Sequence, residues 1–172
     1  EDLTLERRVS VTPDSAKNII DLGLKIYLES GYAKHLGIED AEYKNAGVEI
    51  KNTAKDVIDN CDLLIKVNYP SHNEINNLKE KSILLGVFNP SQKKERFKDV
   101  LKKNINIFSL ELLPRITRAQ SMDVLSSQSN LAGYRAVIDS IYEFEKALPM
   151  MMTAAGTVPA AKVLVIGAGV AG

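Results

Sequence analysis

The chain has 172 residues, of which 45% are hydrophobic and 26% charged, a composition that excludes a disordered tail or a fibrous protein. Lysine and arginine together number 22, as do aspartate and glutamate, so the formal net charge is zero and nucleic acid is not expected as a partner. The single cysteine, Cys61, excludes an internal disulfide and a cysteine-based zinc site. No apolar run approaches the roughly 20 residues that span a bilayer.

Short helices and strands alternate over the first 110 residues. Thr12-Pro13-Asp14 predicts a helix start with Thr12 as N-cap, and Gly23 ends that helix. Strands are expected at 24–28, 48–50, 62–67, 83–88 and 105–110. The other helices are expected at 39–46, at 53–59 with Thr53 as cap, after the capping box Ser71–Glu74, and at 92–103. This alternation predicts a doubly wound parallel α/β sheet with helices on both faces.

The pattern changes after residue 125. A long helix is expected at 127–148, with one apolar stripe formed by Leu131, Tyr134, Val137, Ile138, Ile141 and Tyr142. Pro149 ends it, residues 150–157 form a connector, and 163–166 predict a new buried strand. We therefore expect an α/β domain at 1–125, and at 126–172 a linker helix with the truncated start of a Rossmann domain.

A glycine-rich turn follows that last expected strand. Gly167, Gly169 and Gly172, separated by Ala168, Val170 and Ala171, form the G-x-G-x-x-G pattern of dinucleotide-binding turns. Gly167 would make the tight turn, and Gly169 would let a pyrophosphate approach the backbone. A glycine-rich turn without a ligand is the alternative. The helix and the ribose-binding acid that should follow are absent, so we interpret the chain as a fragment, also because Glu1 is not a natural start.

A polar stretch follows Pro114. It contains Arg115, Arg118, Gln120, Ser121, Asp123 and Ser126. Such residues can fix a nicotinamide carboxamide, which needs both a donor and an acceptor, and ligands of doubly wound sheets gather beyond the carboxyl ends of strands. The alternative is a capped helix start, with Asp123 or Ser126 as N-cap and surface arginines.

These segments resemble a known family. Residues 114–137 (PRITRAQSMDVLSSQSNLAGYRAV) and 149–159 (PMMMTAAGTVP) are similar to the alpha subunit of proton-translocating NAD(P) transhydrogenase. Residues 6–13 (ERRVSVTP) resemble the opening that these subunits share with alanine dehydrogenases. In this family a short strand should precede residue 1.

The resemblance implies that the chain belongs to the peripheral NAD(H)-binding component, a homodimer without a metal. It would exchange hydride with NADP(H) on a partner component while a membrane component moves protons. The expected location is the cytoplasmic face of a bacterial inner membrane, or the matrix side in mitochondria. The segment with Arg115, Gln120, Asp123 and Ser126 would position the nicotinamide, and the glycine turn would hold the pyrophosphate.

Alanine dehydrogenase is the close alternative. Amino-acid oxidation requires a general base, and that family has a lysine and a histidine after two successive strands. The corresponding positions are Asn68 and Asn89, which do not titrate, although Arg8 remains where a substrate carboxylate would bind. Hydride transfer between two nicotinamides needs positioning but no proton exchange. A non-catalytic NAD-binding assembly module is a third possibility.

Overall fold

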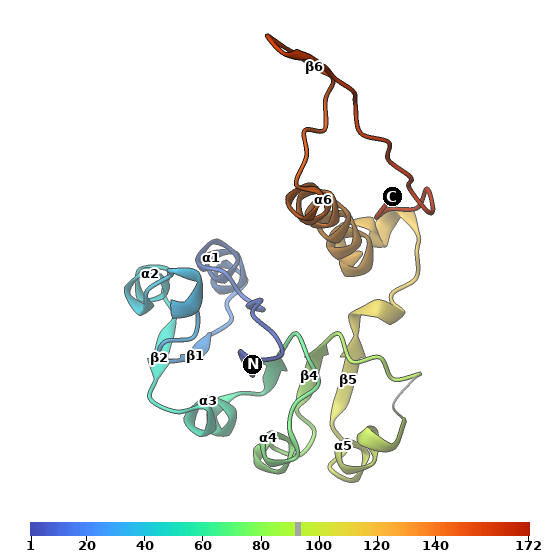
Figure 1. The fold of residues 1–172 in the computed structure, drawn as a ribbon. Helices are drawn as coiled ribbons and strands as arrows, with labels where there is room; N and C mark the ends of the chain where they lie inside the picture. The colour runs from blue at the N-terminus through green and yellow to red at the C-terminus, as the bar shows by residue number, and fades with distance from the viewer. Residues whose placement is uncertain (92–93) are drawn as a thin grey trace. The chain divides into compact units, whose positions relative to one another are not determined.

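A computed structural model describes residues 1–91 and 94–172, which divide into two compact units, Glu1–Leu112 and Leu113–Gly172. The first unit contains two parallel sheets (Figure 1). In one, β1 (Tyr27–Glu29) pairs with β2 (Glu49–Lys51). In the other, the order is β3 (Leu63–Ile65), β4 (Ile83–Gly86) and β5 (Asn106–Ser109). The predicted parallel α/β class is confirmed, but the structure divides the expected single sheet into two.

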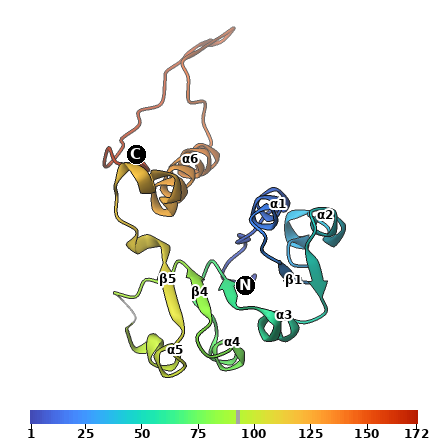
Figure 2. The same ribbon diagram turned by 180° about the vertical axis from the view of Figure 1, so that it is seen from behind.

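Helices lie on both sides of these strands. α1 (Pro13–Asp21) and α2 (Asp40–Asn45) lie on one side, and α3 (Ala54–Asn60), α4 (His72–Asn77) and α5 (Lys98–Lys102) on the other (Figures 1 and 2). The 3₁₀ helices η1 (Lys34–Leu36), η2 (Lys94–Phe97) and η3 (Leu110–Leu112) are short connections. The helix expected at 92–103 is therefore split into η2 and α5, and residues 92–93 lie outside the described part of the chain.

The predicted helix caps form as expected. The Thr12 and Thr53 side chains accept hydrogen bonds from the first turns of α1 and α3. Ser71 and Glu74 form the expected capping box at α4. Local side-chain chemistry therefore determines where these helices begin.

Each sheet has its own apolar core. The first core contains Val11, Ala16, Leu28, Ala33, Tyr43, Ala46 and Val48. Within it the Tyr43 hydroxyl donates to the Val11 carbonyl at 2.8 Å, and burial raises the pKa of Tyr43 to about 12. The second core contains Ile58, Cys61, Leu64, Ile75, Leu78, Leu84, Phe88, Val100 and Ile105. The two cores follow the division between the two sheets.

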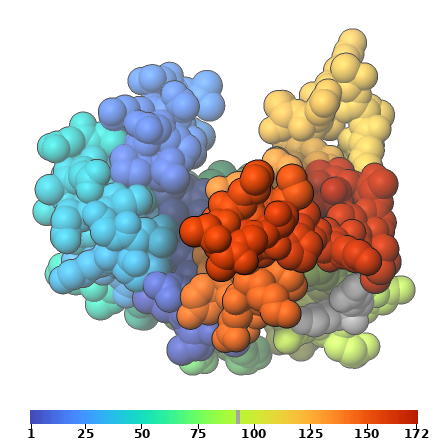
Figure 3. Space-filling model, turned by 45° about the horizontal axis from the view of Figure 1, so that its top comes forward, coloured from blue at the N-terminus to red at the C-terminus, as the bar shows by residue number. Residues whose placement is uncertain are grey.

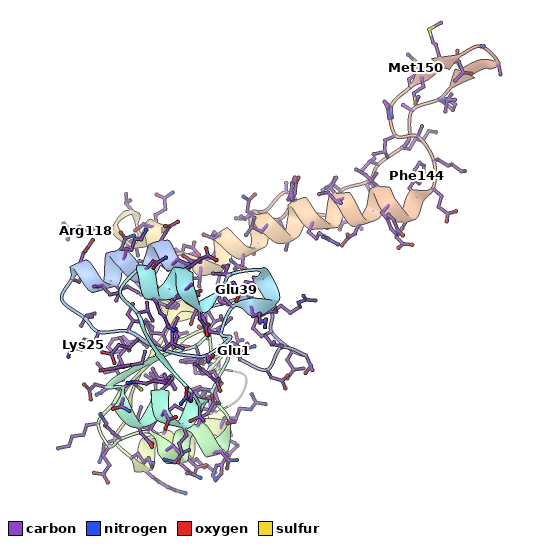
Figure 4. The ribbon with its side chains drawn as sticks, turned by 90° about the vertical axis from the view of Figure 1, so that its left-hand side faces the viewer. Glu1, Lys25, Glu39, Arg118, Phe144 and Met150 are labelled. Atoms are coloured by element: carbon purple, nitrogen blue, oxygen red, sulfur yellow. The ribbon has the colours of Figure 1, made fainter. Side chains whose placement is uncertain are left out.

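The second unit consists of a 3₁₀ helix, a long helix and a hairpin. η4 (Thr117–Met122) leads into α6 (Val124–Phe144). α6 begins three residues before the expected start at 127. It ends before the expected end at 148, because the next residue, Glu145, adopts a left-handed backbone conformation with a φ of 54°. The expected connector at 150–157 instead forms an antiparallel hairpin, β6 (Met151–Thr153) with β7 (Gly156–Val158). Side chains project from all sides of α6, and none is buried (Figure 4).

The strand expected at 163–166 is wrong for this structure. These residues are not in a strand, and their exposed fractions are 62–93%. An apolar run forms a strand only beside another strand that satisfies its backbone groups. Among the described residues, no strand pairs with 163–166.

Candidate functional site

The polar stretch after Pro114 forms the start of the second unit. Residues 117–122 adopt the 3₁₀ helix η4 rather than an open loop. Asp123 is the N-cap of α6: its carboxylate accepts the Ser126 backbone N–H at 2.9 Å and the Ser126 hydroxyl at 2.6 Å. The helix-cap interpretation is therefore confirmed for Asp123. A contact with nicotinamide stays a prediction, because one carboxylate can serve both roles.

The charge of Asp123 is stabilised locally. The two hydrogen bonds from Ser126, and then the nearby Arg115 guanidinium, lower the pKa of this carboxyl below its usual value. The remaining candidate side chains of the stretch, those of Arg115, Arg118, Gln120 and Ser121, are exposed, whereas Ala119 is buried beneath them. This segment is the yellow part of the surface in Figure 3. It therefore offers cationic donors, a carboxamide and an ionised acceptor to solvent.

The glycine turn lies at the end of the same unit. Gly167 has a φ of 105°, in the region that favours glycine, as expected for the residue that makes the tight turn. A Cβ at Gly169 would meet no atom, so the backbone there is open to approach. A Cβ at Gly133 of α6 would overlap the Ala171 carbonyl. The turn thus lies against α6 at Gly133. Gly133 is ten residues after Asp123, which corresponds to about 15 Å along the helix axis.

These two groups offer different kinds of contact to a ligand. The open backbone around Gly169 suits a phosphate, and the Gln120 carboxamide can both donate to and accept from a nicotinamide amide. Val170 is exposed and Gly172 packs back on Gly167.

A second polar cluster lies at the carboxyl end of β3. Arg8 donates to both carboxylate oxygens of Glu6, at 2.8 and 2.6 Å, and this pairing holds the pKa of Glu6 below its usual value. The Asn68 amide lies 3.5 Å from the same carboxylate. The Arg8 guanidinium, which the sequence suggested as a receptor for a substrate carboxylate, is therefore bound by the carboxylate of Glu6.

The lysine at this edge is also paired. Lys66 Nζ lies 2.7 Å from the Glu74 carboxylate, and the two side chains are only 12% and 26% exposed. Burial alone would raise the pKa of Glu74, but the hydrogen bonds from Lys66 and Ser71 outweigh it and the pKa is lowered. Lys66 thus donates to the Glu74 carboxylate of α4.

Sequence reasoning missed Glu111, which follows β5. Its Oε1 accepts the backbone N–H of Phe88 at 2.9 Å and that of Asn89, which has a φ of 50°. Oε2 is buried with no partner among the described residues. Glu111 thereby fixes the turn after β4. Its position shortly after a strand and before Pro114 was the sequence feature that could have indicated a structural role for Glu111.

Two further kinds of feature concern metal binding and membrane insertion. In 1–91 and 94–172 no group of three or more histidine, cysteine, aspartate or glutamate side chains could hold a metal ion. Over the same ranges, no helix combines the length and apolarity needed to cross a membrane.

The sequence matches the models of one protein family over most of its length. Residues 1–132 match the family model "Alanine dehydrogenase/PNT, N-terminal domain", and residues 136–172 match the corresponding C-terminal domain. The units found in the structure meet at 112–113, and our division at 125–126 stays a prediction.

The relatives are transhydrogenases and, at lower identity, alanine dehydrogenases. The chain is 44% identical to an NAD(P) transhydrogenase alpha subunit protein of Rhodospirillum rubrum, covering 97% of this chain and 45% of that protein. An alanine dehydrogenase of Methanococcus maripaludis is 31% identical over the same shares. The solved structure of a transhydrogenase from Sinorhizobium meliloti superposes with a TM-score of 0.94 at 46% identity, over 100% of this chain and 51% of that one. The chain thus spans about half the length of these proteins, and it belongs to the alanine dehydrogenase/PNT family.

Proposed function

We propose that this chain is part of the NAD(H)-binding component of a proton-translocating NAD(P) transhydrogenase. In this role it exchanges hydride between NAD(H) at its own site and NADP(H) on a partner component. The higher identity to transhydrogenase alpha subunits than to alanine dehydrogenases supports this assignment. So does the 0.94 TM-score with a transhydrogenase.

One observation at the edge of the sheet carries the choice between the two enzymes. The positions after β3 and β4 hold Asn68 and Asn89, which cannot accept a proton at neutral pH. The neighbouring Lys66 and Arg8 are engaged by Glu74 and Glu6. Amino-acid oxidation needs a general base and a carboxylate receptor, whereas transfer between nicotinamides needs neither. These paired side chains are suited to stabilising the fold. The polar stretch after Pro114 would then be the part of the chain that positions the nicotinamide.

The residues of the second unit would bind and orient the dinucleotide. The backbone at Gly167 and Gly169 would receive the pyrophosphate, with Val170, Ala171 and Gly172 completing the turn. Gln120 would hold the carboxamide, with Arg115, Arg118 and Ser121 as further donors. Asp123 and Ser126, already rigid in the α6 cap, would fix one face of the ring. NADH supplies the hydride when bound.

The partners follow from this role. An NADP-binding component would face the nicotinamide end, and a membrane-spanning component would couple the transfer to proton movement. The site would then lie at the cytoplasmic face of a bacterial inner membrane, or on the matrix side in mitochondria.

We also propose that the chain forms a homodimer through α6 and the hairpin. The apolar stripe of α6 is exposed, with Tyr134 at 70% and Tyr142 at 80%, and Met152 of the hairpin is 87% exposed. Apolar area of this kind is typical of subunit interfaces. A monomer in sedimentation at micromolar concentration, for a longer protein that includes this chain, would contradict the dimer.

Two assays on such a longer protein test the enzyme. Mixed with the NADP-binding component, it should transfer hydride from NADH to an oxidised NADP analogue. With alanine and NAD, it should produce no NADH. Alanine-dependent NADH would favour the dehydrogenase, and NADH binding without transfer would favour a non-catalytic module.

A further inference from the structure

The long helix α6 is covered at one position in its second half. From Asn130 to Phe144 every residue is exposed except Gly133, which is partly covered. The group that lies over Gly133 is the backbone carbonyl of Ala171, in the glycine-rich turn. The carboxyl end of the chain accordingly lies beside α6 (Figure 1). Gly133 is therefore the position at which α6 receives the turn.

A side chain at position 133 is incompatible with this contact. A Cβ built on Gly133 would lie 2.0 Å from the Ala171 carbonyl oxygen, whereas ordinary contacts of a Cβ begin at about 3.4 Å. The obstructing atoms are backbone, so they cannot rotate away as the end of a long side chain can. The turn would have to move away from the helix by about 1.4 Å, the difference between the two distances.

Gly133 is an unfavourable residue for the helix that contains it. It lies in the interior of a 21-residue helix, where glycine is less favourable than every other residue except proline. Helix formation alone would therefore favour alanine at this position. The close approach of Ala171 is the feature that requires glycine here.

The turn is closed on itself and would move as one body. A Cβ at Gly172 would lie 2.2 Å from the Gly167 carbonyl oxygen, so the two ends of the turn are in contact. A Cβ at Gly169, in contrast, would meet no atom, so the backbone there faces open space. A displacement of Ala171 would consequently also displace the open backbone that is suited to a phosphate.

α6 also carries two of the residues proposed for the nicotinamide. Asp123 and Ser126 are joined at its start by a hydrogen bond of 2.6 Å. Ser126 and Gly133 are seven residues apart, or about two turns, so they lie on the same side of the helix, separated by about 10 Å along its axis. Because the rise of a helix is fixed, the contact at Gly133 determines how far the turn lies from these residues.

We propose that Gly133 is a positioning residue of the dinucleotide site. Because it has no side chain, it lets the phosphate-binding turn rest on α6 at a set distance from Asp123 and Ser126. It acts on the ligand only through the turn. This role rests on the proposed binding of NAD(H) to the turn.

The test uses a longer protein that includes this chain and a complete NAD-binding domain. Gly133→Ala adds the Cβ, and Ala132→Ser, which adds one atom at the neighbouring exposed position, is the matched control. ADP-ribose serves as a probe beside NADH, because it contains the pyrophosphate but no nicotinamide. Gly133→Ala should weaken both ligands by the same factor, at least about tenfold, which corresponds to the loss of one hydrogen bond to a charged group. Ala132→Ser should leave both affinities unchanged, and Gln120→Ala should leave that of ADP-ribose unchanged.

Two measurements without ligand distinguish a displaced turn from a damaged protein. Hydrogen exchange at residues 167–171 should become several-fold faster in Gly133→Ala and stay unchanged in Ala132→Ser. The thermal midpoint of Gly133→Ala should not fall, because alanine is the better helix former.

Unchanged affinities, or unchanged exchange at the turn, would overturn the proposal. A loss of affinity together with a lower thermal midpoint would also overturn it, because helix propensity predicts the opposite. If the unsubstituted longer protein binds neither ligand, the proposed function fails, and the exchange at 167–171 still decides whether Gly133 positions the turn.

Discussion

At the scale of single residues, one side chain can serve both helix capping and ligand positioning. Asp123 is held by two hydrogen bonds from Ser126, so its free oxygen lone pairs have a fixed direction. Gln120 is exposed one turn earlier and has no such restraint. The proposed nicotinamide contact therefore combines a rigid acceptor with an adaptable amide.

Gln120→Ala should reduce hydride transfer far more than it weakens NADH binding. Most binding contacts would come from the pyrophosphate and adenosine ends, whereas a nicotinamide misplaced by about 1 Å can lower the rate on the order of a hundredfold. Single-turnover transfer to an oxidised NADP analogue, beside equilibrium binding of NADH, separates the two effects in a longer protein with its partner component. Ser127→Ala is the control, because the exposed Ser127 hydroxyl donates to the Asp123 backbone carbonyl rather than to its carboxylate. Equal losses of rate and affinity would make Gln120 a general binding residue.

The double substitution Asn68→Lys with Asn89→His should not create useful alanine dehydrogenase activity. The two titratable groups would enter an edge where Glu6 already binds Arg8 and Glu111 fixes the turn at Asn89. A base also needs a shaped pocket and supporting hydrogen bonds. Alanine-dependent NADH formation measures this, and a rate near ordinary enzyme turnover would show that other residues separate the two families.

At the scale of elements, the short helices depend on their caps. α4 has only six residues, and its capping box places Glu74 between the Ser71 backbone and Lys66. An isolated helix of this length is unstable in water, so these contacts and the burial of Ile75 hold it. At α6, which is much longer, the Asp123 carboxylate accepts the Ser126 backbone N–H in the first turn.

Glu74→Gln should destabilise the chain at pH 7 by on the order of 1 kcal/mol, because a charged acceptor is lost. The folded-state pKa of Glu74 lies below its ordinary value of 4.5. Its contribution is therefore complete above pH 4.5 and is lost as the pH falls through the folded-state pKa. Urea unfolding from pH 7 to 3 should show the difference between wild type and variant shrinking below pH 4.5. The exposed Glu80→Gln serves as control, and a difference independent of pH would contradict this account.

At the scale of the whole molecule, the proposed dinucleotide contacts come from two segments of the second unit. It contains the glycine turn and the polar stretch, but residues 163–166 lie exposed without a neighbouring strand. A loose turn has to be ordered by the ligand, and the ordering reduces affinity.

The 172-residue chain should accordingly bind NADH weakly or not at all. Isothermal titration of this chain, beside a longer protein with a complete NAD-binding domain, measures the difference. Comparable affinity in both would show that the turn and the polar stretch suffice. The glycine variant Gly169→Val in the longer protein should lower affinity, which keeps the role of the turn testable by itself.

The sequence by itself determined the features that depend on neighbouring residues. The caps at Thr12, Thr53 and Ser71, the positive φ of Gly167 and the alternation of helices with strands all follow from interactions within a few positions. Only the tertiary structure decided that residues 163–166 form no strand and that, among the described residues, β1 and β3 belong to separate sheets. It also decided that Glu6 binds Arg8 and that Glu111 holds the turn at Asn89. A strand needs a partner distant in sequence, and a polar side chain takes whichever partner the fold brings near it, so neither outcome is encoded in local pattern.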